Sequence, residues 1–294
     1  MRTFVLSTLA MLAFAGNSVL CRLALAEQQI DPSSFSGIRL LSGAVMLVLL
    51  IAVSPNQSAA QGNTRNLRRS LFAALMLFTY ALFFSYAYLS LDAATGALVL
   101  FGVVQTTLVI ISIVRGKTPH TVEWLGLFVA CAGFVYLLLP ELNSPTFFGL
   151  LMMSIAGVAW AFYTAVGQGS LQPLMDTKTN FVYSIPLVVV LALVCLLLGV
   201  DTNATVKGLL LAVSSGAITS AVGYVIWYAV LPKLATMVAA VMQLTVPVIA
   251  AVLGLFLVNE IPTTHLVVSG VIILFGIFLV IVAPKKAVKN GSSL

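Results

Sequence analysis

The sequence contains little charge. Only 7% of its 294 residues are Asp, Glu, Lys or Arg, whereas 61% are hydrophobic. A soluble domain usually has about 25% charged and 45 to 50% apolar residues, so the composition excludes an ordinary soluble fold. Long polar stretches are also missing, because the longest connector, 54–69, is short. The chain is therefore predicted to be an integral membrane protein without a separate soluble domain.

Residue sets that perform catalysis or bind metals are missing as well. The three cysteines, Cys21, Cys131 and Cys195, lack zinc-ligand spacing and are interpreted as small core residues rather than ligands or a disulfide. Both histidines, His120 and His265, lie near the ends of apolar runs, and the sequence has no glycine-rich phosphate loop. We therefore expect no enzyme activity, no metal and no cofactor.

What the sequence does contain is a series of ten apolar runs. Each is close to the roughly 20 residues that a helix needs to cross a bilayer core. Continuous apolar runs favour helices over a β-barrel, whose strands alternate. The predicted fold class is an all-α integral membrane protein with ten transmembrane helices. The runs cover 3–26, 33–53, 70–91, 93–114, 121–139, 147–168, 178–199, 206–231, 234–258 and 263–283.

Basic residues are distributed unequally between the predicted loops. Of fourteen Lys and Arg, eleven fall on the side of the termini, Lys207 alone falls on the other side, and Arg22 and Arg39 lie within runs. The positive-inside rule then places both termini in the cytoplasm and predicts a multi-pass protein of the cell inner membrane. The net charge of +6 is interpreted as a topology signal rather than a nucleic-acid site, and the tail 286–294 as a cytoplasmic basic segment near anionic lipid.

Weak internal similarity relates the two halves of the chain. For example, "FAGNSVLCR" (14–22) aligns with "WAFYTAVGQ" (160–168). Because each half would contain five runs, the halves would insert into the membrane in opposite orientations. The predicted organisation is two inverted five-helix repeats, 1–140 and 145–285, around a central cavity. Inverted repeats of this kind are typical of secondary transporters.

The stretch "QLTVPVIAAVLGLFLVNEIPTTHLVVSGVIILFGIFLVI" (243–281) resembles the second repeat of the drug/metabolite transporter superfamily, in its ten-helix EamA-like branch. Pro247, Glu260, Gly270 and Gly276 are the residues that produce the resemblance. The first half is similar through "FAGNSVLCRLAL" and "FSGIRLLSG". The resemblance implies an exporter of metabolites, often amino acids, that works by alternating access. The resemblance covers nearly the whole chain.

Two finer points follow from this resemblance. Within the branch, "FAGNSVLCRLAL" together with "LVLFGVVQTTLV" is most similar to amino-acid exporters that include aromatic amino acids among their substrates. In one place the sequence departs from the repeat pattern, because Lys117 stands where an acid would be expected. This departure puts an ion pair symmetric to Glu260 in doubt.

Polar and aromatic side chains inside the runs are candidates for a transport path, because polar groups in hydrocarbon should face a cavity or another helix. An amide such as Asn17 could contact substrate or clamp two helices. Tyr80, Phe84 and Tyr88 recur every four residues and so lie on one helical face, and these and the other aromatic residues could line a pocket or pack. Trp227 and Tyr228 could form an interfacial belt. The predicted substrate-binding residues are Asn17, Tyr80, Phe84, Tyr88, Phe101, Gln105, Trp160, Tyr163, Thr164, Tyr224 and Gln243.

Arg22 and Arg39 each lie about a turn or more inside the non-cytoplasmic end of a predicted helix, from which a long side chain can reach water. The acids available on that side are Glu27, Asp31, Asp92 and Glu260. Each arginine is therefore expected to form a structural ion pair, with an external gate or a carboxylate-binding role as the alternative. Pro247 would loosen its helix. The predicted gating or ion-pair residues are Arg22, Arg39, Asp92, Pro247 and Glu260.

These observations predict a secondary transporter, monomeric or homodimeric, whose partners are a small-molecule substrate and the lipid bilayer. It would export small neutral or zwitterionic metabolites, in particular amino acids. No Asp or Glu lies at the middle of a run, which favours gradient-driven transport over proton coupling. The alternatives are a proton-coupled multidrug or organic-cation efflux carrier and a non-transporting membrane scaffold.

Overall fold

A computed structural model describes residues 2–53, 66–114, 116, 120–138, 145–168, 170, 172–230, 233, 242–243 and 245–283. In these ranges the chain is helical throughout, apart from turns, short connectors and one isolated bridge between Ile30 and Ala204. The all-α prediction is therefore confirmed. The elements are α1 (Arg2–Ala26), α2 (Pro32–Ala52), α3 (Leu67–Ala87), α4 (Ala93–Val114), α5 (Thr121–Leu138), α6 (Pro145–Gly167), α7 (Pro173–Leu197), α8 (Val206–Ser214), η3 (Ser215–Val222), α9 (Gly223–Val230), α11 (Thr245–Leu257) and α12 (Thr264–Val282).

Most of these helices are suited to a bilayer. Seven described helical spans are long and apolar enough to cross a membrane, with Val206–Val230 counted as one span, and the apolar helices α5, α11 and α12 are shorter. The prediction of a multi-pass membrane protein is confirmed. The count of ten stays a prediction, because part of the run 234–258 lies outside the described residues. The basic tail 286–294 also lies outside them.

Polar caps determine where several helices begin. Asp31 accepts a hydrogen bond from the backbone N–H of Ser34 at the start of α2, and Pro32 follows it at the first helical position. Thr205 and Thr263 cap α8 and α12 in the same way. Such side chains satisfy N–H groups that have no partner within the helix.

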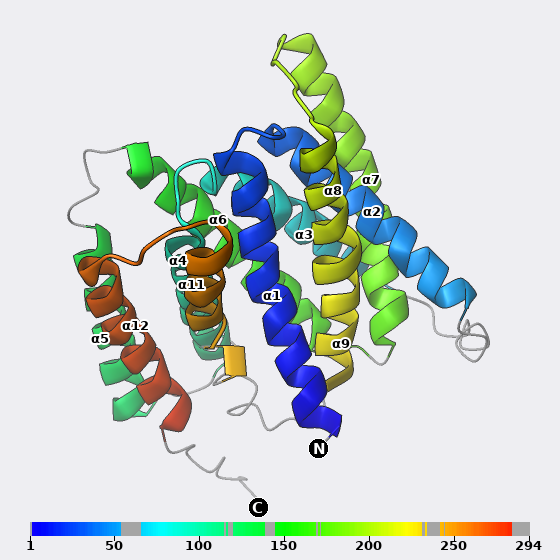
Figure 1. The fold of residues 1–294 in the computed structure, drawn as a ribbon. Coiled ribbons are helices and arrows are strands. Elements are labelled where there is room, and N and C mark those ends of the chain that lie inside the picture. The colour runs from blue at the N-terminus through cyan, green and yellow to red at the C-terminus, as the bar shows by residue number, and fades with distance from the viewer. Residues whose placement is uncertain are drawn as a thin grey trace, which may run out of the picture.

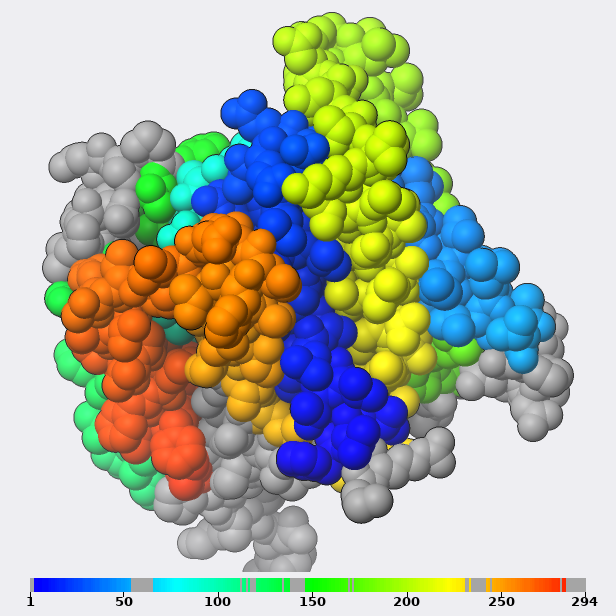
Figure 2. Space-filling view, in the orientation of Figure 1, coloured from blue at the N-terminus to red at the C-terminus, as the bar shows by residue number. Residues whose placement is uncertain are grey.

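Helices from distant parts of the sequence lie side by side. α1 runs down the middle of the face drawn in Figure 2, with α11 and α12 on one side and α8 and α9 on the other. α5 packs against α12, α3 and α4 against α6, α2 against α7 and η3, and α1 against α11 and α9. α1 begins and α12 ends at the same end of the bundle, which we call the terminal end (Figure 1).

Small residues allow the closest of these contacts. A Cβ atom on Gly126 in α5 would lie 2.5 Å from the carbonyl oxygen of Gly276 in α12, and one on Gly276 would lie 2.4 Å from the backbone nitrogen of Ala130. Close approach through small residues is a common way to pack membrane helices.

On the other side of α5, Cys131 is exposed. Its interpretation as a core residue was wrong, because α5 buries mainly the stripe that faces α12.

Candidate functional site

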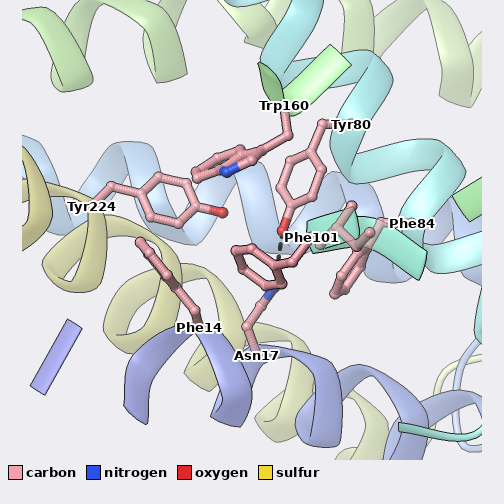
Figure 3. Close-up of a pocket in the computed structure, with 8 residues that line it drawn as sticks. Phe14, Asn17, Tyr80, Phe84, Phe101, Trp160 and Tyr224 are labelled. Atoms are coloured by element: carbon pink, nitrogen blue, oxygen red, sulfur yellow. Dashed lines mark hydrogen bonds between the residues drawn. The ribbon is translucent and has the colours of Figure 1, made fainter. Parts of the chain in front are cut away.

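A small cavity lies where α1, α3, α4, α6 and α9 meet (Figure 3). Its volume is about 10 Å³, which is space for about one water molecule. A central cavity was predicted. The structure has a small, nearly closed one, because aromatic side chains fill most of the space. The residues that line it are Phe14, Asn17, Tyr80, Phe84, Leu100, Phe101, Trp160 and Tyr224.

Aromatic rings form most of the wall. The ring of Phe14 in α1 lies 6.3 Å from Phe101, 6.0 Å from Trp160 and 5.9 Å from Tyr224, measured between centroids. Trp160 in turn lies 4.7 Å from both Tyr80 and Tyr224. These separations are within the range in which rings attract one another. The wall is therefore a continuous set of rings from five helices.

Asn17 holds the polar side of the cavity together. Its Nδ2 donates to the Tyr80 hydroxyl at 3.3 Å (Figure 3), while its Oδ1 accepts from Ser215 at 2.6 Å and from Thr219 at 3.2 Å. All three partners are on other helices. Asn17 is therefore an interhelical clamp that also lines the cavity, while its contact with substrate stays a prediction.

Arg39 lies behind two of the lining tyrosines. Its Nη2 donates to the hydroxyls of Tyr80 at 3.1 Å and Tyr224 at 2.9 Å, and its Nε donates to Ser220 at 2.9 Å. Its Cζ lies 5.0 Å from the ring centroids of both Tyr80 and Phe84, within cation–π range. Only 1% of the residue is exposed.

The expected role of Arg39 as a residue that reaches toward water and forms an ion pair was wrong. Arg39 lies about two helical turns inside α2, and η3 and α9 supply hydroxyl acceptors at that depth. These acceptors turn the side chain into the bundle. Within the described residues, no carboxylate lies within ion-pair distance of Arg39.

Three of the hydroxyls around Asn17 and Arg39 come from a π-helical segment, η3. Such segments have i→i+5 hydrogen bonds and occur frequently at functional sites. In η3, Ser215 and Thr219 bond to Asn17 in α1, while the adjacent Ser220 bonds to Arg39 in α2. Gly216 lets η3 approach α2, since a Cβ there would lie 2.1 Å from the Arg39 carbonyl oxygen.

A second polar cluster lies at the end of the bundle opposite to the terminal end. Arg22 Nε contacts Glu260 Oε1 at 2.5 Å, and Arg22 Nη2 lies 3.5 Å from Asp92 Oδ1. Arg22 Nη1 also donates to the Tyr88 carbonyl at 3.0 Å, and Glu260 Oε2 accepts the Ala93 N–H at 2.8 Å. A carboxylate at the start of α4 is stabilised there by the helix dipole.

This charged cluster joins α1, the end of α3, the start of α4 and the segment after α11. Arg22 follows Asn17 by five residues in α1, a rise of about 7 Å. The cluster therefore lies between the cavity and the end of the bundle. The other acids expected to be available are engaged elsewhere, since Glu27 pairs with Lys207 and Asp31 caps α2.

Several predicted residues are buried but do not line the cavity. Tyr88 stacks edge-on against Phe84 with centroids 4.8 Å apart, and Tyr163 stacks on Trp160 at 5.3 Å. Gln105 follows the lining residue Phe101 by four residues in α4, and Thr164 and Gln243 are also buried outside the lining. Pro247 is buried in α11.

Trp227 and Tyr228 are buried too, with 2% and 5% exposed, so the interfacial-belt alternative was wrong. Trp227 packs on Phe14 with centroids 5.9 Å apart. The ring of Tyr228 occupies the space beside Gly167, where a Cβ would lie 2.5 Å from it. Both residues follow the lining residue Tyr224 along α9 toward the terminal end (Figure 1).

Sequence reasoning missed two lining residues and the η3 hydroxyls. Phe14 precedes Asn17 by three residues in one helix, so helical spacing could have placed both on one face. Leu100 is one of many leucines and had no local signal. The cluster of Ser215, Thr219 and Ser220 in an apolar run was a usable signal, but no pattern indicated a π-helix.

Comparison with known proteins shows that this chain is similar to transporters. Residues 1–139 and 147–282 each match the model of the EamA-like transporter family. An uncharacterized protein of Pseudomonas aeruginosa is 40% identical over 99% of both chains. An uncharacterized transporter of Archaeoglobus fulgidus is 26% identical over 95% of this chain and 96% of the relative. A crystal structure at 16% identity superposes with a TM-score of 0.65, covering 95% and 96% of the two chains, and shows a similar fold.

Proposed function

The chain belongs to the EamA-like transporter family, and from this premise we propose that it exports small neutral or zwitterionic metabolites, in particular amino acids with aromatic or large apolar side chains. The observation that supports this substrate class is the ring-lined cavity. Phe14 and Phe101 face Trp160 and Tyr224 across it. Aromatic walls with few polar groups suit an apolar side chain together with one small polar end.

The arrangement of helix contacts supports two inverted repeats, 1–140 and 145–285. If α1 to α5 correspond in order to α6, α7, the span Val206–Val230, α11 and α12, then α2 packs on its own counterpart α7, α4 on α11 and α5 on α12. The contact of α3 with α6 likewise mirrors that of α1 with α9 and η3. Reciprocal contacts are what a twofold relation between halves produces. We propose cytoplasmic termini in the inner membrane on the basis of the positive charges.

Alternating access would then open the cavity at one end at a time. We propose that the cluster of Arg22, Asp92 and Glu260 is the gate on the non-cytoplasmic side. On the cytoplasmic side, Trp227 and Tyr228 would close the path. The gate contacts are partly solvated, because the side chains of Arg22 and Glu260 are 16% and 15% exposed, so water can replace them during opening.

Transport by purified protein in liposomes tests the proposal. Liposomes loaded with unlabelled phenylalanine should accumulate labelled phenylalanine by counterflow, with and without a pH gradient. A rate that does not depend on the gradient would support facilitated export. A rate that vanishes without it would instead favour proton coupling through Glu260 or Asp92.

A matched pair of variants on α6 links transport to the cavity. Trp160→Ala removes a lining ring and should raise KM about tenfold, the equivalent of roughly 1.4 kcal/mol. Phe162→Ala removes a ring that points away from the cavity, toward Phe72, and should leave KM unchanged. A scaffold that does not transport would show no counterflow in any variant.

A further inference from the structure

Arg39 has more donors than partners. An arginine side chain carries five N–H donors and no acceptor. Three are used, because Nε bonds to Ser220 and Nη2 bonds to both Tyr80 and Tyr224. Nη1 is buried and has no hydrogen-bond partner. Two donors of a buried cation are therefore left without an acceptor.

The charge of Arg39 is also uncompensated. Each of its hydrogen-bond partners is a neutral hydroxyl, and within the described residues no carboxylate lies within ion-pair distance. A charge at membrane depth is costly and usually faces a partner or a substrate path. Here the side of Arg39 that bears the tyrosines faces the cavity, because Tyr80 and Tyr224 both line it.

The direction of the hydrogen bonds gives the cavity a donor character. Arg39 can only donate, so the oxygens of Tyr80 and Tyr224 act as its acceptors. The two hydroxyls also interact with each other and point into the ring cluster in Figure 3, where a ligand acceptor could replace that interaction. The carbonyl oxygen of Asn17 already accepts from Ser215 and Thr219. The polar side of the cavity therefore offers donors and a positive charge, and its acceptors are occupied.

We propose, on the basis of the transport function proposed above, that Arg39 with Tyr80 and Tyr224 recognises a carboxylate group on the transported molecule. The carboxylate accepts the two tyrosine O–H groups and neutralises Arg39, whose Nη1 becomes available as the cavity opens. The remaining rings hold the apolar part of the molecule. A single cation matches one unit of negative charge, so monocarboxylates and zwitterionic amino acids fit, whereas amines without a carboxylate are rejected.

Four compounds that share a phenyl ring separate the contribution of each charge. Phenylalanine and 3-phenylpropionate carry a carboxylate, whereas phenethylamine and phenylalaninamide carry only a cation. In counterflow with wild-type protein in liposomes, the two carboxylates should be taken up at least tenfold faster than the two amines. Uptake of phenethylamine equal to that of 3-phenylpropionate would overturn the carboxylate proposal and leave the transport proposal standing. Uptake of none of the four would overturn both.

Variants assign the selectivity to Arg39. Arg39→Gln should lower the ratio of 3-phenylpropionate to phenethylamine uptake at least tenfold, and Arg39→Lys should retain part of it. Arg68→Gln removes an exposed cation of α3 and should leave the ratio unchanged. Tyr80→Phe with Tyr224→Phe keeps the rings but removes the two O–H donors, and should shift the ratio in the same direction as Arg39→Gln. If neither Arg39→Gln nor the double variant Tyr80→Phe with Tyr224→Phe changes this uptake ratio, the proposal is overturned.

Discussion

Arg22 and Arg39 are the two arginines that lie within predicted spans, yet their surroundings are opposite. Arg22 contacts two carboxylates and a backbone carbonyl, and its side chain is 16% exposed. Arg39 contacts three hydroxyls and two ring faces. One arginine is neutralised by the chain itself, and the other is not.

We propose that this difference separates an arginine whose ion pairs hold the closed state together from one that is kept ready for a ligand. A paired charge stabilises the state in which the pair is formed. A buried unpaired charge lowers stability, which a chain tolerates where the charge has a function. The free energies of unfolding of variants, measured by thermal unfolding in one detergent, test whether the two arginines differ in this way.

The largest effect is expected at Arg22. Arg22→Met leaves Glu260 and Asp92 without their cation and should cost about 3 kcal/mol, because removal of one partner strands the other charge. Lys207→Met breaks the exposed pair with Glu27 and should cost less than about 1 kcal/mol. Equal losses in the two variants would show that the Arg22 cluster contributes no more than a surface pair.

The contact that positions Arg39 should be next. Gly216→Ala places a Cβ 2.1 Å from the Arg39 carbonyl oxygen, and separating the two backbones should cost about 2 kcal/mol. Near the Arg22 cluster, a Cβ on Gly254 would meet Glu260 Oε2 only at 3.5 Å. Gly254→Ala should therefore be neutral or stabilise by up to about 1 kcal/mol. If both variants unfold at the wild-type temperature, close packing does not position Arg39.

A smaller loss is expected at Asn17. Asn17→Leu removes its bonds to Tyr80, Ser215 and Thr219 and should cost about 1 kcal/mol, because interhelical hydrogen bonds in membranes contribute modestly. The control is Thr106→Val, since the Thr106 hydroxyl bonds only to the Gly102 carbonyl of its own helix. A control loss as large as that of Asn17→Leu would argue against a clamp between helices.

The smallest effect on the free energy of unfolding is expected at Arg39. Arg39→Met replaces an unpaired buried cation by an apolar side chain of similar length, and should leave the free energy of unfolding within about 1 kcal/mol of wild type or raise it. Transport of a carboxylate should nevertheless fall. If Arg39→Met destabilises as much as Arg22→Met, then Arg39 stabilises the fold through its contacts as the paired Arg22 does, which would contradict the proposed division.

Local patterns in the sequence were sufficient for much of this molecule. Continuous hydropathy predicted the membrane helices, because a helix in lipid must satisfy its backbone within its own segment. The four-residue spacing of Tyr80 and Phe84 put both on one face of α3, and both line the cavity. Periodicity worked here because the direction of a side chain on a helix depends only on position along that helix.

Spacing failed where the outcome depended on another helix. Arg22 and Arg39 have similar positions in their helices, so the sequence predicted the same behaviour for both. Glu260, the partner of Arg22, is 238 residues away along the chain, and Ser220, a partner of Arg39, is 181 residues away. Local patterns also did not predict the π-helical η3, because no residue pattern within that segment indicates i→i+5 hydrogen bonds.

The sequence by itself determined that the chain is a helical membrane protein, which residues are polar within it, and which face of α3 is aromatic. Tertiary structure alone decided which arginine meets carboxylates and which meets hydroxyls. The physical reason is the distance along the chain over which each effect acts. Hydrophobicity and helical periodicity act over one or a few turns, whereas the neutralisation of a charge depends on atoms that only the packing of helices brings within a few ångströms.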